Sequence, residues 1–301
     1  MRLIIAGLLI MCVSLALTQE KTQDQKDAEK RAEEAAQKSA ADSAANSGWG
    51  HTLIASLNLS QVSFQDWAQG GTNSLSYVTR LRGESTDKAG EILWINSYKF
   101  AFGQTRLGGE GLRKTDDEIH AEALLIYKMG MYINPYVAAT FRSQFAKGYV
   151  YDDTGHGTAT SKFFDPAYLT QSVGMAYKPV EEVTTRLGVA LREILTSEFP
   201  LYADDPATLE LETTKIEGGF ESVTDVRWEF AENMLFTSRL ELFAPFKTLD
   251  RIIVRSDNII AAKVNDYIAT SLSLQLLNDV NVSPRTQVKE MISLGITYTL
   301  L

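Results

Sequence analysis

Three histidines, His51, His120 and His156, are the residues of this 301-residue chain whose type suits acid–base or metal chemistry near neutral pH. His120 and Glu122 are two positions apart, so on a β-strand both side chains would point to the same face. A zinc site takes three or four protein ligands, and two residues fall short of that number. The simpler interpretation is a pair of polar residues on one face of a strand.

The stretch "YDDTGHG" places Asp152, Asp153 and His156 in a glycine-bearing segment. Its oxygens could hold a divalent cation, or the segment could be an ordinary solvated loop. A hydrolase would need a serine, a histidine and an acid or amide partner, and no segment indicates where such a triad would form. The chain also has no phosphate-binding loop and no dinucleotide fingerprint. We therefore expect no enzyme activity, no cofactor and no metal site.

Apolar and polar residues alternate along most of the chain from Trp49 onward. In the C-terminal stretch "TQVKEMISLGITYTLL", Val288, Ile292, Leu294 and Ile296 share one parity, while small or polar residues share the other. Successive side chains of a strand point to opposite faces, so one face is apolar and the other polar. About twelve segments show this pattern, and they are longer than the strands of a typical soluble sheet. They are 50–62, 73–84, 91–104, 117–129, 133–147, 166–178, 182–196, 215–230, 233–245, 251–263, 266–277 and 287–300.

The connections between these segments alternate in length. Those near 85–90, 130–132, 179–181, 231–232 and 264–265 are short, whereas 63–72, 105–116, 148–165, 197–214 and 278–286 are longer; 246–250 departs from the rule. This is the layout of an outer-membrane barrel, with short periplasmic turns and long outer loops. The sequence predicts an all-β fold, a transmembrane antiparallel barrel of about twelve strands. A soluble two-sheet sandwich is the alternative that shares the alternation.

The polar parity of the predicted strands carries charges of both signs, which would face the lumen. They include Arg186, Arg192, Glu217, Glu221, Arg227, Glu229 and Arg239. Mixed signs argue against a strongly ion-selective pore. Residues 182–196 and 215–230 are consecutive strands, so we expect their opposite charges to pair with each other. Such pairs would either line a narrow hydrophilic pore or stabilise a filled lumen.

The N-terminus divides into two further regions. Residues 1–18 carry one basic residue and then an apolar run too short to span a membrane, which predicts a secretory signal peptide. Cys12 lies in that run. Residues 19–48 are rich in Ala, Lys, Glu and Gln, which predicts a helical or disordered periplasmic extension. Residues 49–301 are the predicted barrel, located in the cell outer membrane with both termini periplasmic.

A tryptophan stands in a polar, glycine-containing bend at "FQDWAQGGTNSLSY". Trp67, Gly70, Gly71, Asn73 and Ser74 resemble the first outer loop of a family of bacterial outer-membrane barrels of unknown function, in which Asp66 is often Asn. The resemblance implies a barrel fold and no particular chemistry. The C-terminal "SLGITYTL" resembles the signal read by the barrel-assembly machinery. Its matching residues are Ser293, Gly295, Tyr298 and Leu300, followed by Leu301 where an aromatic residue is usual.

These observations leave three functional hypotheses. The first is a channel or uptake barrel for a small polar solute, the second a structural or partner-binding anchor, and the third a barrel-embedded hydrolase. Outer-membrane lipid and the barrel-assembly machinery are the expected partners. The net charge of −9 argues against a nucleic-acid partner, which would require a basic surface.

Overall fold

The computed structural model describes residues 48–65, 71–130, 132–205, 208–280 and 282–300. The predicted signal peptide and nearly all of the predicted extension lie outside these residues, as do Trp67 and Gly70 of the loop motif. No helix in the described part of the chain is long and apolar enough to cross a membrane.

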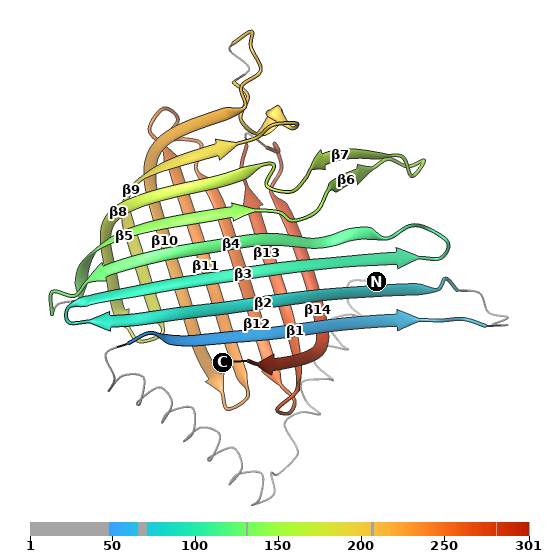
Figure 1. The fold of residues 1–301 in the computed structure, drawn as a ribbon, viewed down its shortest axis with the longest axis horizontal. Coiled ribbons are helices and arrows are strands. Elements are labelled where there is room, and N and C mark those ends of the chain that lie inside the picture. The colour runs from blue at the N-terminus through green and yellow to red at the C-terminus, as the bar shows by residue number, and fades with distance from the viewer. Residues whose placement is uncertain (1–47, 66–70, 131, 206–207, 281, 301) are drawn as a thin grey trace, which may run out of the picture. The chain divides into compact units, whose positions relative to one another are not determined.

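The described residues form a closed antiparallel barrel of twelve strands, which confirms the predicted fold class (Figure 1). Its strands are β1 (Gly50–Val62), β2 (Ser74–Ala89), β3 (Ile92–Leu107), β4 (Arg113–Tyr127), β5 (Ile133–Ser143), β8 (Ala167–Val180), β9 (Val183–Leu195), β10 (Thr214–Ala231), β11 (Met234–Pro245), β12 (Ile253–Lys263), β13 (Ile268–Asn278) and β14 (Gln287–Thr299). Sequential strands are neighbours throughout, and β1 pairs with β14 to close the ring. In Figure 1, strands β1 to β5 cross in front of β10 to β13.

Three connections differ from the sequence prediction. Strand β2 continues to Ala89, so the short turn expected at 85–90 shrinks to residues 90 and 91. Strands β3 and β4 continue past their predicted ends, so the expected long loop at 105–116 shrinks to residues 108–112, where Gly108 turns the chain with a φ of 56°. The connection between β5 and β8 contains an additional hairpin of β6 (Gly148–Tyr151) and β7 (Gly157–Ser161). This hairpin projects beyond the barrel wall in Figure 1. A 3₁₀ turn, η1 (Pro200–Tyr202), lies in the connection after β9.

The alternation gives the barrel an apolar outer wall. Leu187, Val173, Ile292 and Leu294 all point outward, with exposed fractions between 52% and 68%. Their sequence neighbours Arg186 and Ser172 point inward and are buried. Large apolar side chains left this exposed over a whole wall are unusual for a protein surrounded by water.

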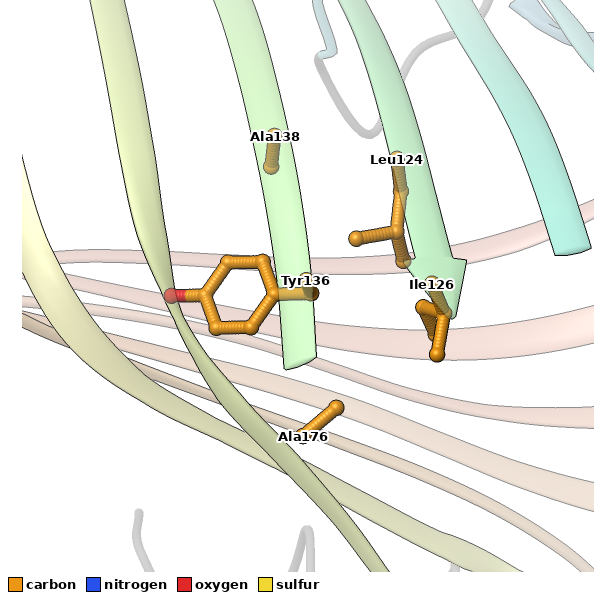
Figure 2. Close-up of a cluster of buried hydrophobic side chains, with 5 residues drawn as sticks. All are labelled: Leu124, Ile126, Tyr136, Ala138 and Ala176. Carbon is orange, nitrogen blue, oxygen red and sulfur yellow. The ribbon is translucent and has the colours of Figure 1, made fainter. Parts of the chain in front are cut away.

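One side of the lumen is apolar near the end that carries the short turns. Leu124 and Ile126 of β4, Tyr136 and Ala138 of β5, and Ala176 of β8 form a cluster with exposed fractions of 2–8%, against which Leu93 and Ile95 of β3 pack. Figure 2 shows these side chains projecting from neighbouring strands. The cluster comes from adjacent strands, so it lines one side of the lumen with packed apolar side chains.

The closing seam is the shortest ladder of the barrel. Strands β1 and β14 pair over five positions, from Ile54 with Thr299 to Asn58 with Gly295. By comparison, β1 and β2 pair over thirteen positions. Fewer backbone hydrogen bonds therefore hold the seam than hold the other side of β1.

Candidate functional site

Strand β4 presents a row of acidic side chains to the lumen. Asp116, Glu118 and Glu122 are separated by even spacings, so the period of two places them all on the inner face. Each of them is buried. A buried carboxylate needs cationic and hydrogen-bonding partners to offset its lost hydration. For these three acids the partners come from strands on several sides of the barrel, including β2, β9, β11 and β12.

Glu118 and Glu122 bind cations that come from other parts of the barrel. Glu122 Oε2 accepts hydrogen bonds from Arg186 Nη2 of β9 at 3.0 Å and from Arg239 Nη2 of β11 at 2.5 Å. Glu118 Oε1 accepts one from Arg255 Nη2 of β12 at 2.9 Å. Strands β4 and β12 are six positions apart in either direction around the twelve-strand ring. The Glu118–Arg255 pair therefore joins opposite walls of the barrel.

Further pairs complete a layer across the lumen. Arg142 of β5 donates to both carboxylate oxygens of Glu241 on β11, at 3.0 and 3.1 Å. Arg239 Nε donates to Glu241 at 2.8 Å. Asp116 binds Arg80 of β2 and Lys289 of β14. We call the following set the ion-pair layer: Asp116, Glu118, Glu122, Arg142, Arg186, Arg239, Glu241 and Arg255.

The ion-pair layer crosses the lumen, and the apolar cluster lines one side of it nearer the short turns. Side chains from opposite walls meet within hydrogen-bonding distance at the layer. Arg186 Nε and Nη1 are buried with no hydrogen-bond partner among the described residues. Passage of a polar solute would require the ion pairs to separate and the apolar cluster to admit water.

The predicted lumen residues occupy three levels. Arg186 and Arg239 belong to the ion-pair layer, whereas Arg192 lies nearer the long loops, where its Nη2 is 3.5 Å from Asp279 Oδ2. Arg227 and Glu229 pair with each other at 3.6 Å and are exposed, at 69% and 72%, near the short turns.

The expected pairing between β9 and β10 is wrong for Arg186, which reaches across the lumen to Glu122. Glu217 stands opposite Arg192 in the ladder, yet it pairs with Lys215. The expectation failed because the inner side chains of a closed wall can reach distant strands as easily as adjacent ones.

A cavity of about 340 Å³ lies between the ion-pair layer and the long loops. Its wall carries charges of both signs. The cations are Arg142, Arg192, Arg255 and Lys289, and the carboxylates are Asp116, Asp117, Glu118, Glu221, Glu241 and Asp279. Tyr168, Phe243 and Tyr202 add aromatic surface, the last from η1. Burial, with a further contribution from Asp165, raises the pKa of Tyr202 above its ordinary value, so this hydroxyl stays protonated at neutral pH. The cavity is at the small end of the range for ligand sites.

The residues of the site that were not predicted from the sequence are Asp116, Glu118, Tyr168, Tyr202 and Asp279. The signal for the first two was present, because "DDEIHAE" alternates acidic residues with others at the same period that identified Glu122. Tyr202 and Asp279 carry no such signal, since they lie in irregular connections whose path depends on the rest of the fold.

The described residues of the first-loop motif lie just before or at the start of β2, and the C-terminal motif lies on and just after β14. Gly71 has a φ of 152°, and Asn73 Oδ1 accepts a hydrogen bond from the Phe64 N–H at 2.7 Å, which bridges the start and end of the first loop. Ser293 and Gly295 face the lumen on β14, while Tyr298 and Leu300 are exposed.

Histidine chemistry has little support in the described residues. Glu122 is held by two arginines, so its carboxylate is committed to those ion pairs. His51 Nδ1 lies 2.8 Å from Ser85 Oγ, which also contacts the Tyr98 hydroxyl. Asp152 Oδ1 accepts bonds from Thr154 and His156 within its own turn. The described residues contain no group of three or more His, Cys, Asp or Glu arranged to hold a metal ion.

The chain is similar to known proteins in part of its sequence and in its general architecture. A family profile described as a protein of unknown function (DUF3078) matches residues 59–149, from the end of β1 into β6. Among proteins with curated descriptions, none matches the sequence.

Three solved barrels illustrate the architectural similarity. The NanC porin is 9% identical, with 83% of this chain and 100% of that chain covered and a TM-score of 0.39. An outer-membrane channel from Pseudomonas putida F1 is 11% identical, with coverages of 84% and 95% and a TM-score of 0.38. The translocator domain of autotransporter NalP from Neisseria meningitidis is 11% identical, with coverages of 91% and 97% and a TM-score of 0.36.

Proposed function

We propose that this chain is an outer-membrane barrel that binds a small polar solute at its long-loop end and admits it through a gated lumen. The apolar outer wall supports the membrane location, because an exposed wall of this kind is stable in lipid and the strands close into a ring. Aromatic side chains near the short turns support it as well, since barrels place such residues at membrane interfaces. They include Trp94, Tyr127, Tyr177, Trp228 and Tyr298.

The orientation follows from the loop lengths. In outer-membrane barrels the short turns are periplasmic and the longer loops face outward. The cavity would then open toward the cell exterior, and the apolar cluster would lie toward the periplasm. Both termini of the barrel would be periplasmic, as expected for an even number of strands.

The observation that carries the proposal is the polar cavity above the ion-pair layer. A barrel needed only as an anchor gains nothing from a solute-sized recess on its outer side. The layer beneath it forms a natural gate, because its members come from separate strands and can part without unfolding the wall. The gate is closed in this arrangement of the chain.

Planar-bilayer recording of wild-type protein and Glu122→Gln tests this gate. Glu122 holds both Arg186 and Arg239, so removing its charge weakens two cross-lumen contacts at once. We expect rare openings in the wild type and at least about tenfold more frequent openings in the variant, corresponding to about 1.4 kcal/mol of gate stability. Arg227→Gln, in an exposed pair away from the layer, should behave as wild type.

A structural or partner-binding anchor is the second candidate, and the cross-lumen ion pairs favour it. Such pairs would brace a barrel whose interior never opens. If neither the wild type nor Glu122→Gln conducts, and Glu122→Gln melts at a clearly lower temperature in detergent, the anchor is the correct function and the gated uptake barrel is wrong.

A further inference from the structure

We infer that the long-loop cavity selects a small carboxylate-bearing solute and that Arg192 is the residue that binds its carboxylate. The inference rests on the proposed function, since it specifies the solute that the gated barrel would admit.

The cavity wall contains four cations and six carboxylates, but three of the carboxylates are shielded by their cationic partners. In three of the pairs that reach the cavity, the cation is the more exposed partner. The exposed side-chain fractions are 38% for Lys289 against 9% for Asp116, 21% for Arg255 against 10% for Glu118, and 13% for Arg192 against 5% for Asp279. These three acids lie behind their partners, so a solute beside them meets ammonium and guanidinium groups first.

Arg192 is the arginine of the wall with the most donor capacity to spare. Its ion pair with Asp279 is 3.5 Å long, at the outer limit of a hydrogen bond. Arg142, by contrast, gives two good hydrogen bonds to Glu241. A guanidinium has five N–H donors in a planar fork that matches the two oxygens of a carboxylate. Arg192 can therefore take a carboxylate while it keeps Asp279 as a neighbour.

Aromatic rings fix the position of this guanidinium. Arg192 Cζ lies 5.2 Å from the ring centroid of Tyr168 and 5.7 Å from that of Phe243, over both rings. Cation–π contacts of this length hold the guanidinium through its face and leave the N–H edge for a ligand. A site whose cation is held in place loses less entropy when a carboxylate binds.

The remaining wall indicates a small solute with hydroxyl groups. Tyr168 and Tyr202 bring phenol groups, and Thr170 and Gln287 bring further polar side chains. A volume of about 340 Å³ suits a ligand of monosaccharide size rather than an oligomer. Glu221 and Glu241 are opposing features, because their carboxylates line the same wall and would repel an anion.

Three hexoses of nearly equal size provide the test: D-glucuronate, D-glucose and D-glucosamine, which are anionic, neutral and cationic. Binding to the purified full barrel in detergent is measured by titration calorimetry. We expect D-glucuronate to bind at least about tenfold more tightly than either other hexose, and high salt to weaken its binding. Arg192→Gln should lose at least about tenfold in D-glucuronate affinity, while Glu221→Gln should gain affinity. Arg227→Gln should match the wild type.

Each contrary result has a distinct meaning. Equal binding of all three hexoses by the wild type would overturn the selectivity for carboxylates and leave the solute-binding barrel intact. A preference for D-glucuronate that survives Arg192→Gln would overturn the assignment to Arg192. The wild-type comparison needs no variant, so it stands even if Arg192→Gln fails to fold. If no hexose binds and Glu122→Gln does not conduct, both this inference and the proposed function are wrong.

Discussion

Arg186 shows how a single lumen residue can depend on a distant strand. Its side chain is 2% exposed, and its partner Glu122 is also buried. Arg186 also lies over the ring of Tyr136, with 5.5 Å between the guanidinium carbon and the ring centroid. Solvent screening is weak at such a site, so loss of one partner leaves the other charge uncompensated.

We predict that Arg186→Ala will destabilise the barrel by about 3–5 kcal/mol, the range for breaking a buried ion pair. Thermal melting in detergent, followed by circular dichroism, measures the change. Arg227→Ala is the control, because its pair with Glu229 is exposed and should contribute at most about 1 kcal/mol. Equal melting temperatures for the two variants would mean that water fills the space around Arg186.

Asp165 links the connection before β8 to the connection after β9 through hydrogen bonds. It is buried between β7 and β8, and its carboxylate accepts hydrogen bonds from the Thr196 and Ser197 hydroxyls, at 2.5 and 2.8 Å. Burial opposes ionisation, but hydrogen bonds from the Glu198 N–H and from these hydroxyls outweigh it and lower the pKa of Asp165 below its usual 3.8. The carboxylate form therefore stabilises the folded connection after β9.

This lowered pKa predicts a pH dependence with a defined sign. The stabilisation is fully present above the unfolded pKa, near 3.8, and is lost as the pH falls through the lower folded value. Hydrogen-exchange protection of the Glu198 amide should accordingly be high at pH 7 and fall below about pH 3.8. In Asp165→Asn the protection should be low at both pH values; unchanged protection in this variant would refute the role of the carboxylate.

At the scale of single strands, β13 presents two chemically different faces. Leu272 points outward, and its neighbour Ser271 points into the lumen, where its hydroxyl lies 2.8 Å from that of Ser293. The ladder pairs Leu272 with Ile292 and Ser271 with Ser293, so each face continues onto β14.

We expect Leu272→Arg to cost about 2–4 kcal/mol, as a charge on the lipid face of a barrel does near the middle of the membrane. Ser271→Arg, one residue away, should cost less, because the lumen already accommodates charged side chains. Folding yields and denaturant midpoints in lipid vesicles would rank the two. If Leu272→Arg were milder than Ser271→Arg, the face of β13 that carries Ser271, and not the face that carries Leu272, would point toward lipid.

The connection between β5 and β8 is more ordered than its length suggests. Phe145 contacts Phe163 edge to face, with ring centroids 5.9 Å apart, and Phe164 makes a similar contact with Phe141 of the wall at 5.5 Å. Phe145 also meets Phe100 of β3 at 5.7 Å. These contacts hold both ends of the connection against the outside of the barrel, from which the β6–β7 hairpin extends.

At the scale of the whole barrel, the weakest closure is the seam between β1 and β14. A disulfide across it should stabilise the ring, because the seam has five paired positions where the other side of β1 has thirteen. Ser56 and Thr297 are direct ladder partners, which places their Cα atoms within disulfide range. The chain's single cysteine, Cys12, lies in the predicted signal peptide, so no barrel thiol would compete.

We predict that oxidised Ser56→Cys/Thr297→Cys gains about 2–4 kcal/mol over its reduced form, seen as a higher melting temperature. The matched control is Ser60→Cys/Ser76→Cys, which joins ladder partners on the long β1–β2 side. Its gain should be smaller, because that ladder already holds the strands and the closed loop is short. Equal gains in the two proteins would show that the seam is not the weak point.

The sequence alone determined the fold class, the twelve strands and the two faces of the wall. Alternation with a period of two is a local property, because each side chain points opposite to its neighbour whatever the strand pairs with. That is why Leu272 and Ser271, or Leu187 and Arg186, could be assigned to faces without a structure. The exact ends of β3 and β4 and the β6–β7 hairpin were missed, since ladder length depends on the partner strand.

Only the tertiary structure decided which lumen residues meet. Whether Glu118 lies opposite Arg255, or Arg186 reaches Glu122, depends on the closure of the ring, the stagger of the strands and the distance across the barrel. These are non-local quantities, and two sequences with the same alternation can differ in all three. The same geometry gathers Tyr202 and Asp279 from separate connections around Arg192, which is why the cavity has no signature in any one segment of the chain.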